Sequence, residues 1–208
     1  MLKLQGGSLD PFASGVLVLG VERGCKALSA FLATRKEYRV VVRLGRSTDS
    51  GDLTGQTVAE SPVPNLTREK VQIAVAALVG KQLQEPPMYS AKKKNGVRLH
   101  TLARQGVQVE RAPVPIEVYK ATLRGYVERG SDVEVDLEVS KGTYVRTLAE
   151  KLGASLGLPA HAFSLSRTRV GPYTINEAVP SELLTNTNAL LAALAKDTVL
   201  ARIAGIKI

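Results

Sequence analysis

Residues 133–139 alternate between apolar and acidic side chains, and this pattern constrains the fold more than any other in the chain. The apolar positions are Val133, Val135, Leu137 and Val139, and the acidic ones are Glu134, Asp136 and Glu138. Because successive side chains of a β-strand point to opposite faces of a sheet, the segment is predicted to be a strand with one buried and one solvated face. Such strands are typical of antiparallel sheets.

The rest of the chain shows the periods of both helices and strands. Apolar residues recur at helical spacing at Val145, Leu148, Leu152 and Leu156, and Gly157 is predicted to end that helix. Helices are also predicted over Ala27, Leu28, Phe31 and Leu32, and between a capping Thr67 and Gly80. Residues 16–21 and 36–44 are predicted to be strands. We therefore expect an α+β domain over residues 1–180, with a mixed, largely antiparallel sheet flanked by helices, and a helical tail over residues 181–208.

The charge of the chain favours a polyanionic partner. Its 208 residues include 28 Lys and Arg against 19 Asp and Glu, a net charge of +9. Clustered cations neutralise phosphates and release counterions, but this charge alone fits either a nucleic acid or an acidic membrane surface. No apolar run approaches the roughly 20 residues that span a bilayer, and no signal peptide is recognisable, so we expect a soluble, cytoplasmic protein.

Cysteine and histidine are too few to suggest a metal or disulfide framework. A single Cys25 cannot form an intramolecular disulfide, and the two His residues make no cluster of metal-ligand spacing. We expect no metal site and no cofactor.

One carboxylate, Asp10, stands in a short loop flanked by glycines. Glycine allows the backbone to turn tightly and to approach a ligand closely, and Pro11 favours an extended or turn conformation at Asp10. Taken alone, an Asp before Pro is ordinary turn chemistry.

The stretch GGSLDPFASGVLVLGV, residues 6–21, resembles the GGTLDP-x-A-x-G-V-L motif of the TruB-type tRNA pseudouridine synthases. In that family the Asp is the catalytic nucleophile, which implies this role for Asp10 and a substrate-binding role for Gly7. A second family motif is similar to residues 36–52, at Lys36, Tyr38, Leu44, Gly45, Thr48, Asp49 and Asp52. There the Tyr stacks on the target base, which implies that role for Tyr38 and substrate contacts for Lys36 and Asp52.

Two later stretches resemble further motifs of this family. KGTYVRTL, residues 141–148, implies an ion pair between Arg146 and Asp10, and substrate contacts for Lys141 and Tyr144. A guanidinium group offers a planar pair of donors that orients a carboxylate, although an isolated Arg is more often a surface residue. GLPAHAFSLSRTRV, residues 157–170, implies that Leu165 packs under the flipped base. We expect His161 to be structural or to contact RNA.

Residues 81–111 form the most basic segment. Seven cations, Lys81, Lys92, Lys93, Lys94, Arg98, Arg104 and Arg111, stand against Glu85 and Glu110. A charge run of this kind is commonly a solvated loop. The segment also resembles the family's PP-x-YSA-x-K and L-x-x-x-AR-x-G stretch, a thumb-like insertion over the tRNA. That resemblance implies RNA contacts for Tyr89, Lys92, Lys93, Lys94, Arg98 and Arg104.

The sequence departs from the family pattern at three places. The motif DKP-x-G-x-(T/S)S of an amino-terminal strand and the carboxy-terminal PUA domain have no counterpart in these residues, so we expect a catalytic domain without them. Gln5 stands where the family usually has a His that helps to accommodate RNA, and we count Gln5 among the substrate-binding residues.

The resemblance implies a tRNA pseudouridine synthase, monomeric and without cofactor, that isomerises a uridine of the T loop. Asp10, Tyr38 and Arg146 would carry the chemistry, after the uridine has left its stack. The alternative is a noncatalytic RNA-binding or tRNA-chaperone protein of the same fold.

Overall fold

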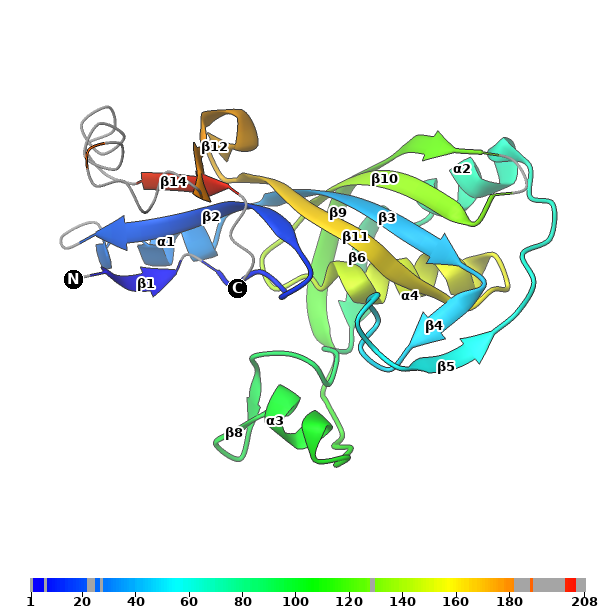
Figure 1. Ribbon diagram of the computed structural model, residues 1–208, viewed down its shortest axis with the longest axis horizontal. Helices are drawn as coiled ribbons and strands as arrows, with labels where there is room; N and C mark the ends of the chain where they lie inside the picture. The colour runs from blue at the N-terminus through cyan, green and yellow to red at the C-terminus, as the bar shows by residue number, and fades with distance from the viewer. Residues whose placement is uncertain are drawn as a thin grey trace. The chain divides into compact units, whose positions relative to one another are not determined.

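The computed structural model describes residues 2–5, 7–21, 25–26, 28–127, 130–181, 188 and 201–204 (Figure 1). The chain divides into two compact units. The first comprises residues 1–39, 138–141 and 165–208, and the second comprises residues 40–137 and 142–164. Three strands, β3 (Lys36–Leu44), β10 (Asp132–Val139) and β11 (Ala160–Val170), contribute residues to both units.

The first unit is built around strand β2 (Ser14–Val21). Strand β1 (Leu2–Gln5) and strand β14 (Ala201–Ala204) pair with it antiparallel, and β11 pairs with it in parallel. Short elements complete the unit: helix α1 (Leu28–Leu32), β12 (Tyr173–Thr174), the 3₁₀ helix η2 (Ile175–Glu177) and β13 (Val179–Pro180). Its apolar core contains Val16, Val18, Leu28, Val170 and Tyr173.

The carboxy-terminal tail was expected to be helical, but residues 201–204 form a strand instead. This strand, β14, pairs with β2 on one side and in parallel with β13 on the other. The edge of β2 offers backbone donors and acceptors, and a strand satisfies them where a helix would not. Residues 182–187 and 189–200 lie outside the described residues, so the expected helices there stay a prediction.

The second unit contains further strands, three helices and a hairpin insertion among its described residues. Its strands are β4 (Arg46–Thr48), β5 (Thr57–Glu60), β6 (Gly80–Gln84), β7 (Lys93–Lys94), β8 (Val97–Arg98) and β9 (Val114–Tyr126). Its helices are α2 (Arg68–Ala76), α3 (Leu99–Arg104) and α4 (Val145–Ser155). The strand order in this unit is β11-β3-β10-β9-β6, and β6 pairs antiparallel with β9.

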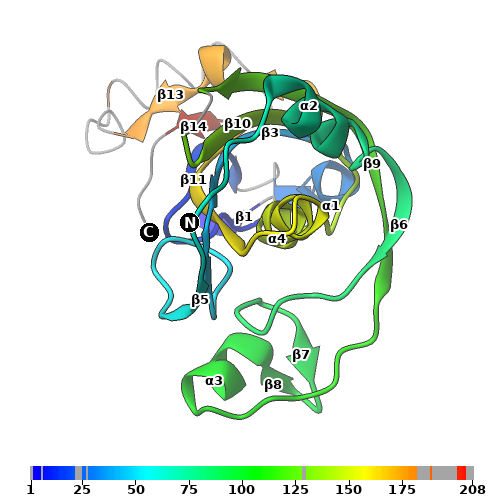
Figure 2. The ribbon, with the colours of Figure 1, turned by 90° about the vertical axis from the view of Figure 1, so that its right-hand side faces the viewer.

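Strand β10 and helix α4 follow the predicted patterns closely. Every second residue of β10 is buried, from Val133 to Val139. Helix α4 buries Val145, Leu148 and Leu152, and Figure 2 shows it on the concave side of the strands of its unit. Gly157 follows the helix with φ +76°, a conformation that glycine adopts without steric cost.

One local prediction needs correction. The side chain of Thr67 caps α2 as expected, accepting a hydrogen bond of 3.3 Å from the backbone N–H of Lys70, but the helix ends at Ala76 rather than near Gly80, which begins β6. The polar stretch 46–57 is bounded by the paired strands β4 and β5. Both kinds of strand pairing occur, and the predicted α+β architecture with a mixed, largely antiparallel sheet is confirmed.

Candidate active site

Asp10 lies in the turn that leads into β2, in the first unit. Gly7 has φ +97°, in the left-handed region that favours glycine. The backbone carbonyl of Asp10 accepts a hydrogen bond of 2.9 Å from the N–H of Ala13, which closes the turn one residue before β2 begins. The Asp10 side chain is half-buried. The turn therefore holds a partly accessible carboxylate next to the central strand of the unit.

Tyr38 lies on β3 in the same unit, and it is buried. Burial raises the pKa of its hydroxyl, because the phenolate is poorly solvated there. Arg167 lowers that pKa through its charge and a hydrogen bond, whereas the carboxylate of Asp10 raises it. Asp10 and Tyr38 therefore lie within electrostatic reach of each other.

Lys36 begins β3, and its ammonium group is buried against backbone. Its Nζ donates to the carbonyls of Thr34, Leu32 and Phe31, at 2.8, 3.2 and 3.5 Å. Burial, with the nearby charges of Arg167 and Lys141, lowers the pKa of Lys36 to about 8. These contacts secure the end of α1, and the substrate contact implied for Lys36 stays a prediction.

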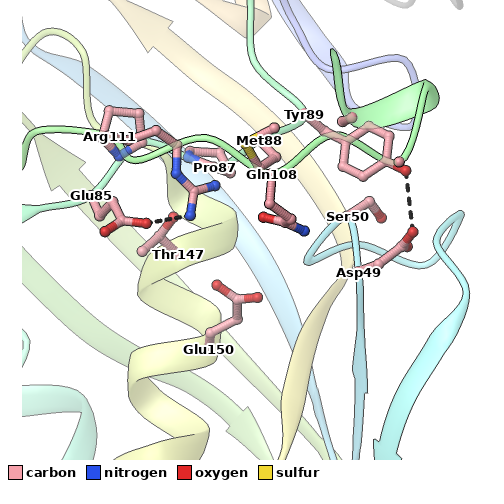
Figure 3. Close-up of a pocket in the computed structure, with 13 residues that line it drawn as sticks. Asp49, Ser50, Glu85, Pro87, Met88, Tyr89, Gln108, Arg111, Thr147 and Glu150 are labelled. Carbon is pink, nitrogen blue, oxygen red and sulfur yellow. Dashed lines mark hydrogen bonds and ion pairs between the residues drawn. The ribbon is translucent and has the colours of Figure 1, made fainter. Parts of the chain in front are cut away.

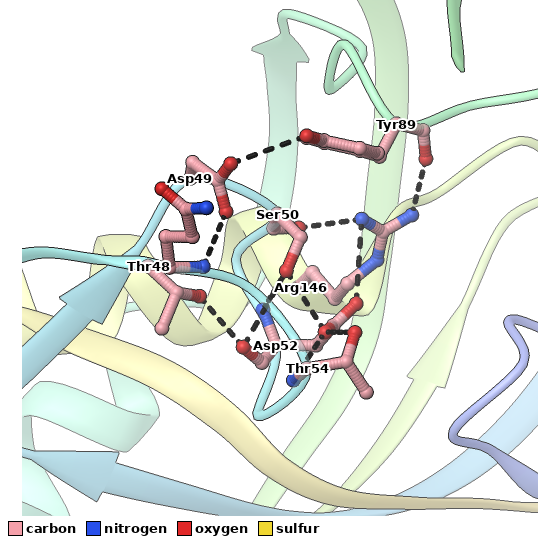
Figure 4. A network of polar contacts seen from close by, with 8 residues as sticks. Thr48, Asp49, Ser50, Asp52, Thr54, Tyr89 and Arg146 are labelled. Carbon is pink, nitrogen blue, oxygen red and sulfur yellow. Dashed lines mark hydrogen bonds and ion pairs between the residues drawn. The ribbon is translucent and has the colours of Figure 1, made fainter. Parts of the chain in front are cut away.

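Arg146 lies in the first turn of α4, in the second unit, and only 2% of it is exposed (Figure 4). Its Nη1 donates to the carbonyl of Ser50 at 2.5 Å and lies 3.8 Å from Oδ2 of Asp52. Its Nη2 donates to the carbonyl of Tyr89 at 2.7 Å. The guanidinium plane is thus fixed by two chain segments that are distant in sequence, and Arg146 is not a surface residue.

The carboxylate of Asp52 is turned into its own loop (Figure 4). It accepts hydrogen bonds from the Ser50 hydroxyl at 2.8 Å, and from the backbone N–H and hydroxyl of Thr54 at 2.9 and 2.6 Å. Asp52 is 5% exposed. This arrangement suits the orientation of Arg146, and the substrate contact implied for Asp52 stays a prediction.

A cavity of about 460 Å³ lies beside this network in the second unit (Figure 3). Its lining includes the 86–89 stretch, Asp49, Gln108 and Glu150. The Tyr89 hydroxyl donates to Oδ2 of Asp49 at 3.1 Å, and Arg111 forms an ion pair with Glu85. Burial raises the pKa of Glu150, while the charge of Arg146 lowers it. Apolar side chains of the 86–89 stretch and several polar side chains therefore line the same cavity.

The basic segment forms a compact insertion between β6 and β9. Strands β7 and β8 make a hairpin whose turn contains Asn95 and Gly96, both with positive φ, and α3 follows directly. Figures 1 and 2 both show the hairpin and α3 standing apart from β6 and β9. The exposed cations are Lys93, Lys94, Arg98 and Arg104, and Lys92 is half-buried. The fold thus brings the five basic residues singled out for RNA contact onto one small element.

Within the described residues, no three side chains of His, Cys, Asp or Glu are grouped so that they could hold a metal ion. The described helices include none that is long and apolar enough to cross a membrane.

Comparison with known proteins identifies the family. Residues 5–145 match the sequence profile described as "TruB family pseudouridylate synthase (N terminal domain)". The chain belongs to the TruB family of pseudouridylate synthases. It is 41% identical to a tRNA pseudouridine synthase B of Bordetella avium over 90% of this chain and 78% of that protein. It is 42% identical to one of Thermotoga maritima over 84% of this chain and 56% of that protein.

Solved structures show the same fold as this TruB family member. A chain in a crystal structure of a Cbf5-Nop10-Gar1 complex matches with a TM-score of 0.66 and 24% identity, over 94% of this chain and 47% of that one. A chain in a structure of an H/ACA RNP bound to a substrate RNA containing 2'-deoxyuridine matches with a TM-score of 0.62 and 21% identity, over 95% of this chain and 49% of that one. The chain spans about half of each of these two chains.

The TruB motifs fall into both units. Asp10, Tyr38, Lys36, Lys141 and Leu165 belong to the first unit, where Leu165 is buried on β11 and Lys141 is exposed after β10. Arg146, Asp52, Tyr89, Tyr144 and the insertion belong to the second. The implied pair of Arg146 with Asp10 stays a prediction. Gln5 ends β1, paired with Leu19 of β2, and its side chain lies outside the described part.

Two residues near these motifs carry structural roles that the sequence did not single out. The side-chain amide of Gln84 accepts from the Tyr144 N–H at 2.7 Å and donates to its carbonyl at 3.0 Å, which fixes the start of α4. Arg167 is buried against the Asp10 loop. His161, expected to be structural or to contact RNA, is also buried, with Nδ1 2.8 Å from the carbonyl of Arg46.

Proposed function

We propose that this chain isomerises a uridine in the T loop of tRNA to pseudouridine, with Asp10 as the nucleophile. The observation that supports this most is the juxtaposition of Asp10 and Tyr38 in one unit of a TruB-family chain. A carboxylate within electrostatic reach of an aromatic ring offers a nucleophile and a stacking surface in the same unit.

The reaction needs the uridine outside its stack, because its glycosidic bond is inaccessible within a folded RNA. A carboxylate oxygen of Asp10 forms a bond to the sugar or to the uracil ring, and the bond between the sugar carbon and N1 breaks. The uracil rotates and rejoins the sugar carbon through C5, and the bond to Asp10 breaks, which restores the free carboxylate. C5 then loses its proton while N1 gains one. Substrate and product are isomers, so the overall reaction consumes no second substrate.

The remaining site residues serve orientation and binding in this proposal. Arg146 pairs with Asp10 and keeps the carboxylate oriented. Leu165 packs under the base. The residues that surround the substrate, directly or through neighbours, are Gln5, Gly7, Lys36, Lys141, Tyr144 and Asp52. The insertion over residues 81–111 acts as a thumb whose Lys92, Lys93, Lys94, Arg98 and Arg104 contact phosphates, beside Tyr89.

We also propose a cellular location and an oligomeric state for this chain. Since its substrate is tRNA, we place it in the cytoplasm, and we propose that it acts as a monomer on one tRNA. Size-exclusion chromatography with light scattering, with and without tRNA, measures the molar mass and so tests whether the chain is a monomer.

The experiment is incubation of the chain with an unmodified tRNA transcript carrying tritium at uridine C5, followed by measurement of tritium release and mapping of pseudouridine. A transcript with cytidine in place of the T-loop target gives the background. Asp10→Asn replaces the nucleophile by an amide of the same shape, so we expect no product and nearly unchanged tRNA binding. Asp136→Asn is the matched control, since Asp136 pairs with Arg124 on the solvated face of the sheet.

Product from wild type and from Asp136→Asn, but not from Asp10→Asn, supports the proposal. A wild-type chain that binds tRNA and forms no pseudouridine would point instead to the noncatalytic RNA-binding alternative.

A further inference from the structure

Arg167 joins the Asp10 loop to the central strand of the first unit. Its Nε donates to the carbonyl of Val16 at 2.7 Å. Its Nη2 donates to the carbonyl of Gly7 at 3.1 Å, and its Nη1 donates to that of Ser8 at 3.4 Å. Arg167 is 1% exposed and is among the largest fully buried side chains. One rigid group therefore holds both β2 and the two loop carbonyls that precede Asp10.

The close approach of strands β11 and β2 places Arg167 next to the Asp10 loop. β11 and β2 pair in parallel, with Arg167 opposite Gly15. A Cβ atom at Gly15 would lie 2.2 Å from the carbonyl oxygen of Arg167, and Gly15 has φ +110°, so both space and conformation require glycine. The missing side chain at Gly15 lets the backbone of Arg167 lie this close to β2.

The charge of Arg167 is not needed for packing. The nearby charged groups that act with it on Lys36 and Tyr38 are Lys141 and Asp10. Burying a charge is unfavourable even where it is hydrogen-bonded, and an apolar side chain of similar size would fill the space at lower cost. What the guanidinium adds is a set of donors in one plane, aimed at the loop and at Tyr38.

We propose that Arg167 is a positioning residue, which fixes the Asp10 loop relative to Tyr38 so that nucleophile and stacking ring face the same uridine. This inference rests on the proposed function. Its first consequence is that Arg167 contributes to the rate of the chemical step and not to tRNA affinity. A second consequence is that a positive charge at residue 167 is not sufficient to hold the loop. The ammonium group of a lysine cannot reach the carbonyls of Val16, Gly7 and Ser8 from one position.

The test compares Arg167→Lys and Arg167→Gln with wild type, in single-turnover pseudouridine formation at saturating enzyme and in tRNA binding. The matched control is Arg169→Lys, since Arg169 lies two residues further on the same strand, is half-exposed and pairs with Glu37 at 3.5 Å. Circular dichroism and thermal unfolding check that each variant folds. Should Arg167→Gln fail to fold, Arg167→Lys carries the comparison, because it retains the charge and most of the volume.

We expect Arg167→Lys to lower the single-turnover rate about tenfold to a hundredfold, as a small misplacement of reacting groups does, with tRNA affinity unchanged and Arg169→Lys like wild type. A folded Arg167→Lys with the wild-type rate would overturn the inference, and so would a loss confined to tRNA affinity. An inactive wild type would instead count against the proposed function, which keeps the two failures distinguishable.

Discussion

The carbonyl of Tyr89 accepts a hydrogen bond of 2.7 Å from Nη2 of Arg146. Tyr89 stands at the start of the basic insertion, and Arg146 stands in the first turn of α4. The same guanidinium group contacts Ser50 and Asp52. The insertion proposed to bind tRNA and the arginine proposed to orient the nucleophile are therefore parts of one hydrogen-bonded network.

Arg146→Lys should reduce turnover strongly and leave tRNA binding largely intact. A single ammonium group cannot donate at once to the carbonyls of Ser50 and Tyr89 and still present a planar fork. We expect the single-turnover rate to fall about a hundredfold or more, in line with a misplaced catalytic group. Arg124→Lys is the control, since Arg124 is an exposed partner of Asp136. Equal rates for Arg146→Lys and wild type would refute the orienting role.

Asp52→Asn should have a smaller effect than Arg146→Lys, in the same direction. The substitution removes the negative charge that lies 3.8 Å from Arg146 but preserves an oxygen that Ser50 and Thr54 can reach. We expect the rate to fall about tenfold, because the buried guanidinium loses one opposite charge that helps to orient it. If the variant loses tRNA affinity instead, Asp52 is a substrate contact rather than a support for Arg146.

Tyr38→Phe should retain the bound, flipped uridine and Tyr38→Leu should not. Stacking of a base on an aromatic ring is worth roughly 1–3 kcal/mol, and Phe keeps the ring. Fluorescence of 2-aminopurine placed next to the target uridine reports base flipping in each variant. Similar flipping in Leu and wild type would exclude stacking on Tyr38. A Phe variant that flips the base but turns over slowly would assign importance to the hydroxyl that contacts Arg167.

Replacing Lys92, Lys93 and Lys94 by Gln should weaken tRNA binding and flatten its dependence on salt. Each phosphate that is no longer neutralised by a lysine lowers the slope of log affinity against log salt concentration by about 0.7–0.9. A triple change of exposed cations elsewhere, Lys70, Lys120 and Arg124 to Gln, removes the same charge from other surfaces and is the control. Identical slopes in the two triple variants would exclude the insertion as the phosphate-binding surface.

Lys36 should make stability depend on pH in the alkaline range. Its pKa is lowered to about 8 in the folded chain from an ordinary 10.5, so the unfolded chain binds more protons between these values. The unfavourable contribution of the buried ammonium is therefore complete below pH 8 and disappears as the pH rises to 10.5. Urea unfolding of wild type and of Lys36→Met at several pH values measures this contribution as the difference between their free energies of unfolding. We expect this difference to shift in favour of wild type with rising pH. A difference that does not change with pH would contradict the burial of the charge.

The sequence alone determined the local elements and the residues of the motifs. The alternation over 133–139 produced β10, and the helical spacing after Val145 produced α4, because each pattern encodes which face of one element is buried. Resemblance was enough to single out Asp10, Tyr38 and Arg146, since these residues stand in contiguous motifs.

The tertiary structure alone decided which polar groups support those residues. Arg146 is held by carbonyls 96 and 57 residues away in sequence, and Arg167 by carbonyls 151 to 160 residues away. Gln84 reaches Tyr144 across 60 residues. Backbone carbonyls are present at every position, so the sequence carries no mark of the ones that a buried side chain will meet. Only the packing of distant strands and loops, which removes water from both partners, selects them.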